Sequence, residues 1–292
     1  MSKKLFIAQI KLMQNKIGYI LAFSVVFILC LYSTLQSAIS ASELSSMNAP
    51  TSAFVFILRS NANGNELLRQ LYVFILIFPF CFISAKNSKL GIDNIIISKT
   101  STRKYTYTNV LTAFVGSFMC FFVPFIIQLV INKIVFPPNL EPQLLYGYSG
   151  AELTGDNVFA NTVQKGVPFI SLYIKHPNLY NLLYAFIFSS FCGILAMLVQ
   201  AISNFIKRFS IVLFLPIYLI TFIQSRIDAA ILFKGVEQER AYVNVNMTDY
   251  VLIDTFYGKS KVYFIGLVVF IISITVILTE ISVRKRACAN AN

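Results

Sequence analysis

Long apolar stretches alternate with shorter polar segments along the whole chain of 292 residues. Six of these stretches approach the roughly 20 apolar residues that an α-helix needs to cross the hydrocarbon core of a bilayer. They occupy residues 17–35, 67–85, 110–135, 179–203, 209–224 and 262–281. We therefore predict an all-α integral membrane protein with six transmembrane helices, folded as a single transmembrane domain over residues 1–292.

The segment before the first stretch, residues 3–16, carries too many charges to cross a membrane. Phe6, Ile10 and Met13 recur at the spacing that brings side chains onto one face of a helix, and Lys11 falls on another face. This pattern predicts an amphipathic helix that lies in the membrane interface. The alternative is that these residues extend the first span into the cytoplasm.

The charge of the chain is strongly unbalanced, with 24 Lys and Arg residues against 12 Asp and Glu residues. Threading the six stretches through a bilayer places the whole surplus of +12 on the side that holds both termini and residues 86–109 and 204–208. Cytoplasmic loops retain Lys and Arg in this way. We therefore expect both termini in the cytoplasm, and we assign the charge to topology and membrane lipids rather than to a nucleic-acid partner.

The composition also bears on location. Ile, Asn, Lys, Phe and Tyr are abundant and Trp is absent, which suggests an AT-rich bacterial genome. We expect a multi-pass protein of the cell (plasma) membrane of a Gram-positive bacterium.

Residue types that perform chemistry are scarce inside the predicted spans. No Asp, Glu, Lys, Arg or His lies in the middle of a span, which disfavours a proton-coupled transporter or an intramembrane enzyme. Four of the five cysteines lie within spans and no CxxC pair occurs, so neither disulfides nor a metal site are expected. Gly258-Lys259-Ser260 lacks the earlier glycine of a phosphate-binding loop. We predict no catalytic residue, no metal and no cofactor bound by this chain.

The predicted outer loops cover residues 38–66, which are polar, and residues 136–178 and 225–261. The 136–178 loop is the longest, and its many Pro and Gly residues predict an irregular structure. The 225–261 loop contains two apolar runs too short to cross, which suggest re-entrant or interfacial segments. Within the spans, Pro79, Pro124 and Pro216 each remove a helical hydrogen bond and are expected to kink their helices.

The inner loop at residues 86–109 holds the most specific local pattern. Gly91 allows a sharp turn, residues 92–98 fit a short helix along the membrane surface, and Ser101 or Thr102 can cap the helix that continues into the third span. A short surface helix between two spans is a compact handle, because a cytoplasmic partner that grips it can tilt both spans.

The pattern Gly91…Ser98-x-x-x-x-Arg103-x-Tyr105 in this loop resembles that of the membrane (permease) subunits of type-two ATP-binding-cassette (ABC) exporters. As an architecture the resemblance covers the whole chain: an amphipathic leader, six spans and short apolar segments between the last two. It implies that the loop docks on cytoplasmic ABC ATPase subunits, which bind ATP and Mg, and that a second permease copy or a related permease completes the pathway. The residues implied in ATPase coupling are Gly91, Asp93, Asn94, Ser98, Lys99, Arg103 and Tyr105.

The same resemblance implies a translocation pathway along the first, second and fifth spans. Its lining or hinge residues would be Pro79, Phe80, Phe82, Pro216, Tyr218 and Phe222. The expected function is export of an amphipathic substrate, a peptide first and a lipid or drug second. The alternative is a non-transporting sensor or immunity module that binds a ligand through its outer loops. A weaker hypothesis is a membrane enzyme using outer-loop carboxylates, although their spacing specifies no site.

Overall fold

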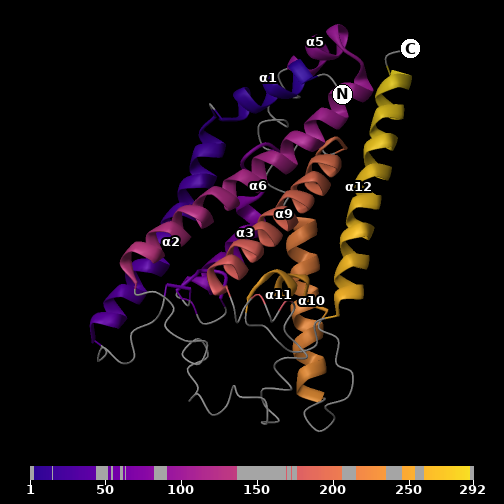
Figure 1. Ribbon diagram of the computed structural model, residues 1–292. Helices are drawn as coiled ribbons and strands as arrows, with labels where there is room; N and C mark the ends of the chain where they lie inside the picture. The colour runs from indigo at the N-terminus through magenta and orange to yellow at the C-terminus, as the bar shows by residue number, and fades with distance from the viewer. Residues whose placement is uncertain are drawn as a thin grey trace.

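The computed structural model shows an all-helical chain (Figure 1). It describes residues 3–14, 16–43, 52–53, 55–59, 62, 64–81, 91–136, 169, 172, 176–205, 215–234, 245–253 and 260–289. The helices are α1 (Lys3–Gln14), α2 (Ile17–Glu43), α3 (Asn65–Ile75), α5 (Ile92–Lys99), α6 (Thr102–Val135), α9 (Pro177–Ser203), α10 (Leu215–Lys234), α11 (Met247–Val251) and α12 (Lys261–Ala289).

Four helices, α2, α6, α9 and α12, are long and apolar enough to cross a membrane. They correspond to the first, third, fourth and sixth predicted stretches. A helix rises about 1.5 Å per residue, so even the shortest apolar segment of the four, 24 residues in α2, exceeds the roughly 30 Å of a hydrocarbon core. The prediction of a multi-pass membrane protein is confirmed at this level.

The second and fifth predicted stretches fold differently. Helix α3 has 11 residues and ends at Ile75, after which residues 76–80 form successive turns that contain Pro79. In α10 the apolar part, Leu215–Ile227, is shorter than 18 residues. The described residues therefore show four helices of spanning length, and the six-span arrangement stays a prediction.

The three prolines have different effects. Pro124 lies inside α6, which nevertheless continues as one helix of 34 residues. Pro216 is the second described residue of α10, and the residues before Leu215 lie outside the described part of the chain, so the kink expected at Pro216 stays a prediction. Pro79 follows the end of α3, where the helix gives way to turns.

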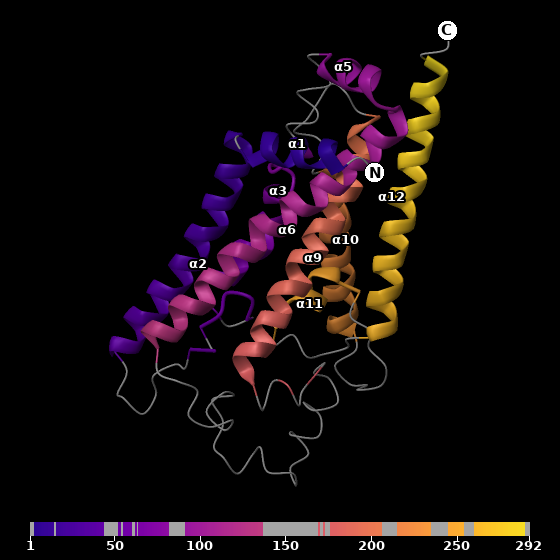
Figure 2. The same cartoon turned by 45° about the horizontal axis from the view of Figure 1, so that its top comes forward.

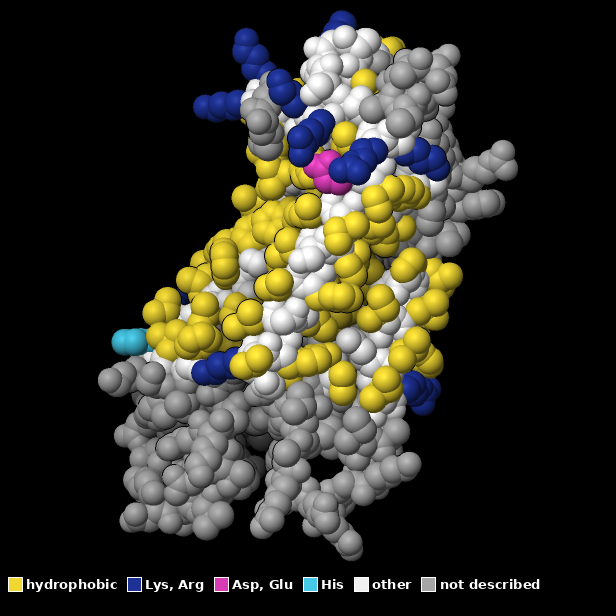
Figure 3. Space-filling model, turned by 90° about the vertical axis from the view of Figure 1, so that its right-hand side faces the viewer, with side chains coloured by type: hydrophobic (Ala, Val, Ile, Leu, Met, Phe, Trp, Pro, Cys, Tyr) yellow, Lys and Arg dark blue, Asp and Glu magenta, His cyan; other side chains and the backbone are white. Residues whose placement is uncertain are grey.

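Both chain termini lie at the same end of the bundle, together with α1 and α5 (Figures 1 and 2). We call this the basic end, because Lys and Arg residues of α1, α5, the start of α6 and the end of α12 gather there. Viewed from the side of α12, Lys and Arg side chains cluster at this end and a broad apolar band follows below them (Figure 3). Charges beside an apolar band are typical of a protein that sits in a bilayer.

The core is formed mainly by α6 packed against α9. A Cβ atom on Gly193 of α9 would lie 2.7 Å from the ring of Phe114, so only glycine permits this approach of the two helices. Next to it, Phe188 contacts Phe121, Phe125 and Tyr72 edge-on, with ring centroids 5.6–5.8 Å apart. These contacts connect α3 to the α6–α9 pair.

A non-helical segment is buried beside this core. The described residues between 52 and 59, which we call the buried segment, are at most 2% exposed. The sequence predicted a polar outer loop for residues 38–66, and this part of it is apolar and buried rather than polar. The apolar run Ala53–Leu58 explains the difference, because burying it removes a continuous apolar surface from water.

Candidate functional site

The helix α5 forms as the inner-loop pattern predicts, over Ile92–Lys99. It begins after Gly91, whose φ of 71° lies in the left-handed region that glycine adopts freely. The next helix begins after Ser101, whose Oγ accepts a hydrogen bond of 3.3 Å from the Lys104 amide. Of the two predicted caps, Ser101 is the one used.

Asp93 fastens α5 to two long helices. Its side chain is 8% exposed, and one carboxylate oxygen accepts a hydrogen bond from the Tyr105 hydroxyl on α6. The other lies 4.0 Å from the Arg286 guanidinium on α12, which also donates to Asn204 Oδ1 at the end of α9, at 3.3 Å. We call Asp93, Tyr105, Arg286 and Asn204 the basic-end clasp. It joins four helices through polar contacts with little access to water.

A second, more exposed group lies beside the clasp. The Arg103 guanidinium is 2.7 Å from Glu280 Oε1, and the Tyr107 hydroxyl donates to the same oxygen at 2.7 Å. Arg103 also lies over the Tyr107 ring, 5.9 Å from its centroid. The Arg103 side chain is 69% exposed, so water and salt weaken this pair.

The amphipathic helix α1 lies across the long helices at the basic end (Figure 2). Met13 is buried, Phe6 and Ile10 are half-buried and Lys11 is exposed, in agreement with an amphipathic helix. The pattern did not predict the buried Gln9. This side chain donates to Asn109 Oδ1 and accepts from Thr112 Oγ1, and both partners are on α6.

The outward face of α5 combines an apolar and a basic residue. Ile95 is 61% exposed, and Ser98 and Lys99 are also exposed. The exposed face of α5 is therefore mixed, with one apolar, one polar and one basic side chain within two turns. The side chain of Asn94 lies outside the described residues.

The structure divides the residues predicted for ATPase coupling into two sets. Asp93 and Tyr105 are buried in the clasp and position α5, whereas Ser98, Lys99 and Arg103 are open to the surface. Ile95 was not among the predicted residues, although its place on the same face as Ser98 and Lys99 follows from helical spacing. For Arg286 and Glu280 the sequence indicated only a contribution to the charge of the basic end. Their partners Asp93 and Arg103 lie more than 170 positions away in sequence, so no local pattern could reveal the contacts.

The residues predicted for a translocation pathway do not share one environment. Pro79 and Phe80 are buried near the end of α3, whereas Tyr218 and Phe222 stack on each other on the exposed face of α10. The two elements do touch, because Phe74 of α3 and Tyr218 have ring centroids 5.7 Å apart. Phe82 lies outside the described residues.

The end opposite the termini contains a buried polar network that the sequence did not predict. Arg59 of the buried segment is 0% exposed and donates from Nε to the Ala53 carbonyl at 2.9 Å. The Arg59 Nη2 donates to Oδ1 of Asn181 on α9 at 3.4 Å. The Nδ2 of the same Asn181 donates to the Ala53 carbonyl at 2.8 Å. The Leu58 carbonyl accepts from the Ile253 amide at 2.9 Å, which ties the segment to the residues after α11.

Side-chain amides and hydroxyls join the same segment to α2, α3 and α6. Gln128 of α6 donates to the Cys30 carbonyl at 3.2 Å and accepts from the Ile57 amide at 3.4 Å. Asn65 donates to the Ile57 carbonyl at 2.8 Å. Backbone groups without a helical partner are tolerated at membrane depth only where the protein satisfies them in this way.

The described residues contain no cluster of three His, Cys, Asp or Glu side chains that could bind a metal. Cys30, Cys81, Cys120 and Cys192 are buried and free. No family model, curated protein or solved structure matches this chain. The interpretation of the site therefore depends on its geometry alone.

Proposed function

We propose that this chain is the permease subunit of an ABC exporter, driven by separate cytoplasmic ATPase subunits. The observation that carries the proposal is the mounting of α5: a short helix on the basic end, attached through Asp93 to Tyr105 of α6 and Arg286 of α12. A force applied to α5 reaches two long helices directly. It reaches α1 as well, because α1 is hydrogen-bonded to α6.

The proposal includes six membrane crossings with both termini in the cytoplasm. Helix α5 lies at the same end as α1, so the chain between α2 and α5 must return across the bundle, and α3 lies on that route (Figure 1). Likewise, Arg286 near the end of α12 donates a hydrogen bond to Asn204 after α9, so α9 ends at the basic end. Helix α12 begins at Lys261 at the opposite end, so the chain between Asn204 and Lys261 must cross the bundle (Figure 1). The segment containing α10 lies on that second return.

The proposed substrate is amphipathic, a peptide before a lipid or a drug. Support comes from α10, where the exposed Tyr218 and Phe222 rings lie beside a guanidinium, with Arg226 5.1 Å from the Phe222 centroid. Such a face suits a cargo with both apolar and polar groups. A second permease copy or a related chain would complete the route, and ATP and Mg would bind in the ATPase.

The test is purification from the native cell membrane in mild detergent, followed by identification of a copurifying nucleotide-binding subunit. The variants Ile95→Asp and Lys99→Glu change the exposed face of α5 and are expected to reduce the copurified ATPase. Lys285→Glu is the control, because Lys285 is an exposed lysine of the same end on α12.

Two outcomes decide the matter. Loss of the ATPase with the α5 variants, together with its retention with Lys285→Glu, supports the hypothesis that the ATPase docks on α5. Absence of any nucleotide-binding subunit, together with binding of an extracellular ligand by the purified chain, would support a sensor or immunity module instead.

A further inference from the structure

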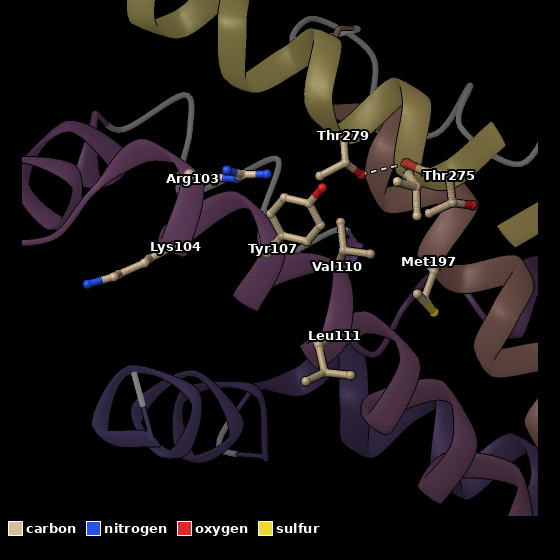
Figure 4. Close-up of a pocket in the computed structure, with 9 residues that line it drawn as sticks. Arg103, Lys104, Tyr107, Val110, Leu111, Met197, Thr275 and Thr279 are labelled. Atoms are coloured by element: carbon tan, nitrogen blue, oxygen red, sulfur yellow. Dashed lines mark hydrogen bonds between the residues drawn. The ribbon is translucent and has the colours of Figure 1, made fainter. Parts of the chain in front are cut away.

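A groove of about 460 Å³ opens between α6, α9 and α12 near the basic end (Figure 4). Its volume lies within the roughly 300–1,000 Å³ that small-molecule sites usually occupy. It belongs neither to the clasp nor to the predicted pathway. The residues that line it are Arg103, Lys104, Tyr107, Val110, Leu111, Met197, Thr275, Val276 and Thr279.

The groove changes from polar to apolar along α6. Arg103, Lys104 and Tyr107 form one rim, and Val110 and Leu111 follow one to two turns further on. Arg103 and Leu111 are eight positions apart, which corresponds to about 12 Å along a helix axis. The groove therefore offers a charged rim at the level of the basic end and an apolar floor toward the membrane core.

The rim carries a net positive charge. Arg103 and Tyr107 both contact Glu280, so the charge of Arg103 is largely balanced. Lys104 is exposed, and its side chain extends away from the ring of Tyr107 (Figure 4). Arg284 follows Glu280 on α12 and adds to the positive charge nearby. The long, freely rotating stem of Lys104 lets its ammonium follow an anion placed at the rim.

We propose that this groove binds one anionic phospholipid of the cytoplasmic leaflet. Its phosphate lies at the rim beside Lys104, and one acyl chain follows Val110, Leu111, Met197 and Val276. The order of charge and apolar surface along the groove matches the order of headgroup and chain in such a lipid. Basic grooves between spanning helices on the cytoplasmic side suit anionic headgroups. The proposal requires that α6, α9 and α12 span the membrane and does not depend on an ATPase.

Native mass spectrometry of the purified chain tests the headgroup assignment, by titration with phosphatidylglycerol and with phosphatidylcholine. We expect tighter binding of phosphatidylglycerol. Lys104→Gln should weaken that binding by about fivefold, because one basic residue near anionic lipid contributes roughly 1 kcal/mol. Lys285→Gln, an exposed lysine that does not line the groove, should change it little. Equal losses in the two variants, or equal binding of the two lipids, would overturn the assignment.

Two substitutions on α12, one test and one control, examine whether an acyl chain occupies the groove. Val276→Phe fills the groove, and displacing about two buried methylene groups is expected to weaken phosphatidylglycerol binding about tenfold. Val269→Phe is the control, because Val269 is 56% exposed on the same helix and does not line the groove. Binding that withstands Val276→Phe, or that glycerol phosphate without acyl chains reproduces, would contradict the lipid assignment.

Fluorescence gives an independent measurement, because the chain contains no Trp. Tyr107→Trp places a single indole at the rim, where its N–H can still donate a hydrogen bond. Brominated phosphatidylglycerol should quench this indole more than brominated phosphatidylcholine does. Adding Lys104→Gln should abolish the difference between the two lipids. Equal quenching with Lys104 in place would show that only bulk lipid reaches the groove.

Discussion

Arg59 and Arg103 lie toward opposite ends of the bundle in very different surroundings. Arg59 is 0% exposed and donates hydrogen bonds to the Ala53 carbonyl and to Asn181. The Arg103 side chain is 69% exposed and pairs with Glu280 at the surface. Hydrogen bonds away from water are strong and costly to leave unmade, whereas exposed ion pairs contribute little to stability.

This difference indicates which end resists displacement more strongly. At the far end, the buried segment is held by α2, α3, α6 and α9 through its backbone, so displacing it would break many desolvated bonds together. At the basic end, α5 is attached through one buried carboxylate, and the neighbouring contacts face water. We therefore expect α5 to be displaced more easily than the buried segment.

The largest effect on stability is expected from Arg59→Met, which keeps much of the side chain's length. It removes the donors to Ala53 and Asn181. The Ala53 carbonyl keeps its hydrogen bond from Asn181, but a buried acceptor left unmet, such as Asn181 Oδ1, costs about 1–3 kcal/mol. The midpoint of thermal unfolding in detergent should fall by many degrees. A thiol-reactive dye can report it, because four free cysteines are buried in the folded chain.

Arg226→Met is the matched control for this change. Arg226 is exposed and lies over the Phe222 ring, so its loss leaves no buried group unsatisfied. If both variants shift the unfolding midpoint equally, the far end is not the rigid part of the molecule.

A smaller, local effect is expected from Asp93→Ala. The change removes the acceptor of the Tyr105 hydroxyl and the carboxylate nearest Arg286, at a cost of about 1–3 kcal/mol. Backbone amides of residues 91–105 should then exchange with deuterium about tenfold faster or more, since 1.4 kcal/mol is a factor of ten. Hydrogen exchange with mass spectrometry measures this in the purified protein.

Glu280→Gln separates the clasp from the surface pair in the same experiment. Glu280 binds Arg103 and Tyr107 in an exposed position, so its loss should change the exchange of α5 much less than Asp93→Ala does. The reverse ranking would show that the surface pair, and not the clasp, holds α5.

The elements that sequence alone could predict are those with local causes. The spanning helices follow from long apolar runs, α1 from the spacing of Phe6, Ile10 and Met13, and α5 from Gly91 at its start and the Ser101 cap of the helix that follows it. Each signal is contained within a few residues or one window. Helix α5 ends one residue beyond the predicted range.

Elements with non-local causes could not be predicted. The described residues of the short run 53–58 can be buried because Gln128 and Asn181, more than 70 residues away in sequence, bond to backbone groups of the run. In the same way, the role of Asp93 depends on Arg286 at the other end of the chain. The sequence identified Asp93 as an important residue of the loop. It could not show that burial makes this carboxylate an attachment of α5 rather than part of its surface.

The smallest effect is expected from Gly91→Ala at the start of α5. A Cβ atom at Gly91 would meet no atom within 4 Å, so the substitution tests the backbone and not the packing. At a φ of 71°, alanine costs roughly 1–2 kcal/mol in the left-handed region. Exchange at α5 should rise modestly, and the unfolding midpoint of the whole bundle should hardly change.

Gly91→Asn sharpens this prediction, because asparagine tolerates the left-handed region better than alanine does. If the turn requires only this backbone conformation, Asn should restore most of the protection that Ala loses. If Asn and Ala are equally harmful, the left-handed turn is not what sets the position of α5. The position of α5 would then depend on the Asp93 carboxylate and not on the turn at Gly91. The difference between this single attachment and the several hydrogen bonds that hold the buried segment would be larger still.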